Sequence, residues 1–163
     1  MKIFIGSDHA GYEMKEKLIE YLAGLELGYE VTDKGAFEYK EDDDYPDFVY
    51  PVALAVAENQ GSFGIVLGGS GQGEAMCANK VSGARAVVFY GQEDMEPTPG
   101  GEMTSETFQM IKLGREHNNA NILSIGARFV SLDKAKFAIE LFLATPFSQA
   151  ERHLRRLDKL EPK

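Results

Sequence analysis

The sequence predicts a doubly wound α/β fold: a five-stranded parallel sheet in three layers, with strand order 2-1-3-4-5. The alternation of two apolar patterns along the chain supports this prediction. Five short apolar runs alternate with segments whose apolar residues recur at helical spacing, and five β-α units in succession form a parallel sheet covered on both faces. The strand order is a common one for five such units, and it places ligands where the order reverses, between strands one and three.

The predicted strands are short apolar runs. Residues 2–6 (KIFIG) end in glycine, and residues 63–69 (FGIVLGG) are the most strand-like run in the chain. Such continuous runs are typical of strands buried on both faces. The remaining strands are predicted at residues 29–33, 85–90 and 121–126.

The predicted helices follow from apolar stripes. Met14, Leu18, Tyr21, Leu22 and Leu25 lie on one face at i, i+4, i+7, i+8 and i+11, as in an amphipathic helix. A second helix follows Pro46, where Pro51 is expected to kink the first turn or delay its start. The remaining helices are predicted at about residues 74–81, 106–117, 135–144 and 149–160.

The composition bounds the function. A chain of 163 residues fits one domain; we expect an α/β domain over residues 1–146 and a basic C-terminal helix over 147–163 that packs on it or on a dimer partner. The formal charge of −9 argues against nucleic acid or an anionic membrane as a partner. The single cysteine, Cys77, excludes an intramolecular disulfide and a cysteine-based zinc site. No signal segment is recognisable, so a cytoplasmic protein is expected.

Two loops should meet at the switch point between strands one and three. They are the segment from Ser7 to Gly11 and the segment from Gly68 to Glu74. The second has four glycines in six positions before a helix, so its amides can approach an oxyanion or phosphate closely. Glu74 stands where a Walker A loop needs lysine, and the glycine spacing fits a dinucleotide fingerprint poorly.

Several polar residues have both a functional and a structural interpretation. Glu74 is either a first-turn acid that complements the helix dipole or a base that removes a carbon-bound proton while Ser70 and nearby amides hold the resulting enediolate. Asp8 and His9 either order their loop or bind substrate. His117 is ordinarily a helix cap.

The remaining candidates are basic side chains and two loops. Arg152 and Arg156, four residues apart, form either a salt-bridged surface or a phosphate clamp. The acidic stretch 38–47 has six carboxylates and no histidine, which favours a solvated loop over a metal site. The Pro/Gly-rich loop 91–103 is a candidate lid.

Six blocks of this sequence together resemble the ribose-5-phosphate isomerase B family, which includes galactose-6-phosphate and related sugar-phosphate isomerases. The blocks run in order along nearly the whole chain: SDHAG at 7–11, DYPD at 44–47, GGSGQGEAMCANK at 68–80, REHNNAN at 115–121, IGAR at 125–128 and RHLRR at 152–156. The resemblance implies a cofactor-free, metal-free aldose-ketose isomerase that works through a cis-enediolate. It also implies a homodimer, or a dimer of dimers, whose active sites draw on both subunits.

The resemblance also implies roles for residues. Glu74 is expected as the base, Ser70 as a stabiliser of the enediolate, and Asp8 and His117 as ring-opening groups, with His117 given by the partner subunit. The substrate-binding positions implied are His9, Tyr45, Gly69, Gly71, Gly73, Asn118, Arg128, Arg152 and Arg156. Of these, His9 and the three arginines match phosphate-binding positions.

Two departures from the family pattern affect this expectation. Many members carry a catalytic cysteine where this chain has Gly69, and a subgroup with GGSG followed by Gly-Glu uses the glutamate instead. The chain is also longer than usual between Arg85 and His117, with the excess in loop 91–103. Ribose 5-phosphate is the expected substrate; the alternatives are another pentose or hexose phosphate, such as galactose or allose 6-phosphate, or a noncatalytic nucleotide-binding module of flavodoxin-like topology.

Overall fold

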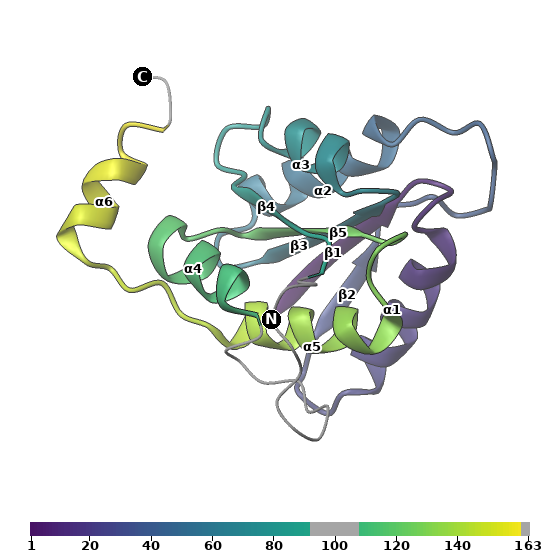
Figure 1. Ribbon diagram of the computed structural model, residues 1–163, viewed down its shortest axis with the longest axis horizontal. Coiled ribbons are helices and arrows are strands. Elements are labelled where there is room, and N and C mark those ends of the chain that lie inside the picture. The colour runs from purple at the N-terminus through teal and green to yellow at the C-terminus, as the bar shows by residue number, and fades with distance from the viewer. Residues whose placement is uncertain (92–107, 161–163) are drawn as a thin grey trace.

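The computed structural model describes residues 1–91 and 108–160 (Figure 1). Strands and helices alternate along the chain as the sequence predicts. The strands are β1 (Lys2–Ser7), β2 (Glu30–Asp33), β3 (Phe63–Gly68), β4 (Ala86–Phe89) and β5 (Ile122–Gly126), and the helices are α1 (Tyr12–Gly24), α2 (Pro46–Glu58), α3 (Gln72–Ala78), α4 (Gln109–Asn118), α5 (Leu132–Ala144) and α6 (Glu151–Leu157). Within the described ranges, no helix is long and apolar enough to cross a membrane.

All the strand pairs are parallel, but the order is 2-1-3-5-4, so the predicted order 2-1-3-4-5 is wrong. The fifth strand lies between β3 and β4 and pairs with both. The burial of the two strands agrees with this order. All five residues of β5 are buried, whereas three of the four in β4 are half-buried. The inner strand β5 has both of its edges paired and both of its faces covered, whereas β4 lies at the edge of the sheet.

The sheet separates two apolar layers. Helices α1, α4 and α5 cover one face around Leu22, Ile111 and Phe142, and helices α2 and α3 cover the other around Val52 and Ala78. The two clusters confirm the three-layer arrangement. The pairing of β1 with β3 also brings the two predicted loops together, because Ser7 is in register with Leu67 at their carboxyl ends.

Some boundaries differ from the sequence prediction. Helix α2 begins at Pro46 and contains Pro51, so this proline does not delay its start. Helix α3 begins two residues before Glu74, which places this residue in the first turn. Residues 92–103 of the predicted lid lie outside the described residues.

Candidate active site

The loop after β1 presents Asp8 and His9 at the carboxyl edge of the sheet. The Asp8 Oδ1 atom accepts hydrogen bonds from the amides of Ala10, at 2.9 Å, and Gly11, at 3.2 Å. Gly11 is needed here, because a Cβ at this position would lie 2.6 Å from the Leu67 Cβ atom. The loop is therefore pressed against β3, and Asp8 is fixed by local amides.

The glycine-rich loop after β3 is shaped by one left-handed residue and by β5. Gly71 has a φ of 76°, a conformation that favours glycine. Its carbonyl accepts a 2.7 Å hydrogen bond from the Ser124 hydroxyl of β5. A Cβ at Gly126 would meet the Ser70 carbonyl oxygen at 2.8 Å. The central place of β5 thus fixes the loop that carries Ser70.

Glu74 turns back over the start of this loop. Glu74 is buried, with 4% of its surface exposed, and a Cβ at Gly68 would lie 1.8 Å from Glu74 Oε1. The Glu74 carboxylate therefore occupies the space that any side chain at position 68 would need. The resemblance places the catalytic cysteine of other family members at the position of Gly69, whereas in this structure Gly68 is the glycine that faces the Glu74 carboxylate.

Glu74 and Asp8 are both buried at this edge of the sheet, and the charge of Asp8 acts on Glu74. Burial raises the pKa of Glu74, and the charge of Asp8 raises it further, while hydrogen bonds from the Glu74 and Gly71 amides oppose the shift. Burial also raises the pKa of Asp8. A carboxylate destabilised in this way is a stronger proton acceptor than one in water. Cys77, one turn along α3, has a pKa raised by burial and then by the charge of Glu74, which disfavours its reactive thiolate.

The other substrate-binding candidates at this edge lie against the same loop. A Cβ at Gly69 would be 3.1 Å from the Arg128 Cζ atom, and a Cβ at Gly73 would be 2.9 Å from the Tyr45 Cζ atom. The Arg128 amide donates to the Gly69 carbonyl at 3.2 Å. The exposed guanidinium of Arg128 is thus held over the loop by β5.

One residue at this edge was not predicted from the sequence. The Asp43 Oδ1 atom lies 2.7 Å from His9 Nδ1, so a histidine does join the acidic stretch 38–47. Asp8, His9 and Asp43 offer ligand atoms within 4.8 Å of one another. The Oδ1 atom of Asp8 is already bonded to amides and the His9 Nδ1 atom to Asp43, so these contacts have a structural explanation without an ion.

Four of the predicted residues lie elsewhere. His117 and Asn118 end α4, just before β5 begins, and Arg152 and Arg156 belong to α6. Arg128 follows the other end of β5, and a five-residue strand spans about 15 Å. Figure 1 shows α4 and α6 on the left and the 34–45 segment on the right of the sheet. One chain therefore does not bring the two groups together.

The far group is compact. The His117 and His153 rings are 4.2 Å apart between centroids. Burial lowers the pKa of His153, and the charges of His117, Arg152 and Arg156 lower it further. The arm before α6 is tied to α4 by the Ser148 amide, which donates to the Glu116 carbonyl at 3.1 Å. The structure thus places His117 and both arginines around one buried imidazole.

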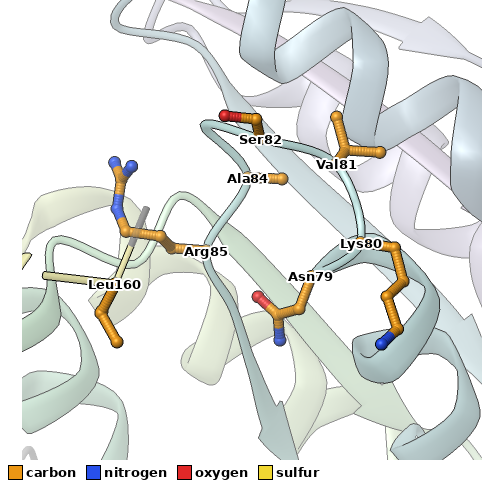
Figure 2. A pocket seen from close by; sticks show the side chains of 7 residues that line it. All are labelled: Asn79, Lys80, Val81, Ser82, Ala84, Arg85 and Leu160. Atoms are coloured by element: carbon orange, nitrogen blue, oxygen red, sulfur yellow. The ribbon is translucent and has the colours of Figure 1, made fainter. Parts of the chain in front are cut away.

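A pocket of about 490 Å³ lies near the start of β4 (Figure 2), and Glu74 is not among the residues that line it. The segment after α3 lines one part of it and Leu160 another, and Figure 2 shows Arg85 between them. None of the predicted site residues lines it. The candidate active site is therefore the carboxyl edge around Glu74.

A family model described as ribose/galactose isomerase matches residues 3–98 and 104–160. A ribose-5-phosphate isomerase B of Mycobacterium tuberculosis strain H37Rv is 42% identical over 160 residues, which covers 98% of this chain and 88% of that protein. The chain belongs to the ribose-5-phosphate isomerase B family. The family member of Escherichia coli strain K12 is 35% identical over 159 residues, covering 98% and 93% of the two chains.

Solved structures of the ribose-5-phosphate isomerase B family agree with the fold. The enzyme from Mycoplasma genitalium with bound ribulose-5-phosphate matches with a TM-score of 0.82 and 34% identity, covering 98% of this chain and 93% of the other. The enzyme from Clostridium thermocellum matches with a TM-score of 0.81 and 39% identity, covering 98% and 95%.

Proposed function

We propose that this chain is an aldose-ketose isomerase that interconverts ribose 5-phosphate and ribulose 5-phosphate. The observation that carries the proposal is the buried carboxylate of Glu74 against Gly68, beside a glycine-rich loop. Family membership supports it, because the curated relatives described above carry this activity in their names.

The proposed reaction begins with ring opening by Asp8 and by His117 of a second copy. In the open aldose, Glu74 removes the proton from C2, and the electron pair of that bond forms the C1–C2 double bond while the carbonyl oxygen becomes anionic. A proton moves from O2 to O1, and Glu74 returns its proton to C1 to give the ketose. Only proton transfers are needed, so the step balances without a metal or redox cofactor.

The Ser70 hydroxyl and the amides of the glycine-rich loop would stabilise the enediolate. Of the amides assigned this role, that of Gly71 donates to the Glu74 carboxylate, so it also orients the base. Tyr45 packs on Gly73 and would form a wall of the pocket. Among the phosphate ligands, His9 and Arg128 belong to the same edge, and Arg128 affects the charge state of His9.

We infer a homodimer in which His117, Asn118, Arg152 and Arg156 complete the active site of the other subunit. These residues lie at the opposite edge of the sheet from Glu74 in one chain, so only a second copy can supply them. The arm of residues 147–163, beyond the α/β domain of 1–146, would carry the two arginines across. A single cysteine and a phosphorylated metabolite favour a cytoplasmic location.

Mixed dimers test the shared site. Glu74→Gln and His117→Ala chains should each be nearly inactive, and refolding them together should restore part of the activity. One of the two sites in a mixed dimer would then have both residues intact. If heterodimers form and remain inactive, both residues serve the same subunit and the proposed arrangement is wrong.

The family description also names galactose, which keeps a hexose phosphate as the second candidate substrate. Comparing kcat/KM for ribose 5-phosphate with that for galactose and allose 6-phosphates decides between them. We expect the pentose phosphate to be preferred; a higher value for either hexose phosphate would overturn that choice. Stabilisation by nucleotides, without any isomerisation of these sugars, would instead favour a binding module.

A further inference from the structure

Asp43 differs from the other carboxylates of the acidic stretch 38–47. Its side chain is 6% exposed, whereas Glu38, Glu41, Asp42, Asp44 and Asp47 are all exposed. Burying a carboxylate is costly unless hydrogen bonds compensate. A solvated loop therefore explains five of these acids and leaves Asp43 to be explained.

Both hydrogen bonds that Asp43 Oδ1 accepts involve His9. The His9 amide donates to it at 2.9 Å, and its ring Nδ1 lies 2.7 Å from it. The Asp43 Oδ2 atom is buried and makes no hydrogen bond within the described part of the chain. The buried carboxylate of Asp43, in the long loop before α2, therefore contacts the loop after β1 through His9.

This geometry determines which ring nitrogen carries the proton. A carboxylate oxygen can only accept, so the short contact requires a proton on His9 Nδ1. The other nitrogen, Nε2, is then the one left to meet a ligand, and it donates to an anion when the ring is cationic. The His9 side chain is 26% exposed, so it remains accessible from solvent.

His9 lies among charged groups of both signs, and Asp43 is one of the two acids among them. Arg128 and the acids Asp8 and Asp43 all act on its charge, and the Tyr39 ring lies edge-on at 6.4 Å. The hydrogen bond to Asp43 is the largest cause that raises the pKa of His9, whereas burial and Arg128 lower it. The Asp43 carboxylate, hydrogen-bonded to the His9 ring, therefore opposes the effect of Arg128 on the pKa of His9.

We propose that Asp43 is a positioning residue that fixes the His9 ring with Nε2 as the donor to the substrate's phosphoryl group. The inference rests on the proposed function, since it assumes a phosphorylated ligand beside Arg128. Asp43 does not touch the reacting carbons, so it should affect substrate binding far more than the proton transfers at C1 and C2.

The first test uses the unaltered protein. The chain has three histidines, so ring nitrogen NMR signals can be assigned by comparison with a His9→Ala variant. Above its pKa, His9 should keep the proton on Nδ1. A neutral ring protonated on Nε2 would overturn the proposal. This experiment needs no turnover, so it stands even if ribose 5-phosphate proves not to be the substrate.

The second test uses Asp43→Asn, which keeps an acceptor for the His9 amide but removes the charge. We expect KM for ribose 5-phosphate to rise about tenfold, the scale of one hydrogen bond to a charged group, with kcat nearly unchanged. The pKa of His9 should fall, and the alkaline decline of kcat/KM should move to lower pH. Asp42→Asn removes the charge of an exposed neighbour and serves as the matched control, with unchanged constants.

A double-mutant cycle separates positioning from general stability. In a His9→Ala background, adding Asp43→Asn should leave KM unchanged, because the residue through which Asp43 acts is gone. Equal losses with and without His9 would show a structural role and overturn the proposal. If Asp43→Asn fails to fold, the His9 tautomer measured in the unaltered protein decides whether the proposal holds. If the tautomer and cycle agree but galactose 6-phosphate is the better substrate, only the choice of sugar in the proposed function fails.

Discussion

Replacing Gly68 with alanine should remove most of the turnover while leaving the fold intact. A Cβ at this position would lie 1.8 Å from Glu74 Oε1, 2.2 Å from its Cδ and 2.9 Å from its Oε2. The carboxylate would have to retreat by about 1.6 Å to reach an ordinary 3.4 Å contact. A misplacement of about 1 Å in a catalytic group can cost about 10²-fold in rate, so we expect kcat to fall by at least that factor.

The loss should appear in kcat rather than KM, because the atoms nearest to a Cβ at position 68 all belong to Glu74, the proposed base, and not to a residue proposed to bind phosphate. Gly24→Ala is the matched control: this glycine ends α1, and a Cβ there would meet nothing within 4 Å. It should fold normally and keep full activity. A folded Gly68→Ala protein with the original kcat would refute the reasoning that Glu74 must occupy this space.

Three further outcomes follow from the charges of the site. Arg156→Ala should chiefly raise KM, because a distant phosphate is held in ground and transition states alike; an unchanged KM refutes its role. In the original chain the pKa of Glu74 is raised in the folded state, so the folded protein loses stability as the pH rises through that pKa. The Glu74→Gln variant has no such group, so it should melt at a higher temperature than the original chain at neutral pH. The difference should disappear below the ordinary value of 4.5, and kcat/KM should decline as acid protonates Glu74.

The sequence predicts the alternation of strands and helices well because each element carries its own pattern. The run at 63–68 is apolar throughout, and the loop after it is rich in glycine, so both could be placed without a structure. The exchange of β4 and β5 could not be foreseen, because RAVVFY and NILSIG are both short apolar runs. Their difference lies in how completely they are buried, which depends on the finished packing.

The site shows the same limit. Glu74 and Asp8 could be proposed from their loops, but the contact between Glu74 and Gly68 depends on a side-chain direction that sequence does not give. Asp43 was hidden within six acids of similar appearance. Asp43 lies 34 residues after His9 in the sequence, and its two contacts with His9 form only because the loop before α2 folds back onto the loop after β1. No local pattern marks such a contact.

The most direct test of the central claim is kcat for the isomerisation of ribose 5-phosphate by Glu74→Gln and Cys77→Ser. Losing one general base typically costs about 10² to 10⁴ in rate, so Glu74→Gln should fold normally and turn over more slowly by that factor. Cys77→Ser should keep its activity, since burial and the charge of Glu74 raise the pKa of the thiol. Full activity in Glu74→Gln, or an inactive but well-folded Cys77→Ser, would contradict the account.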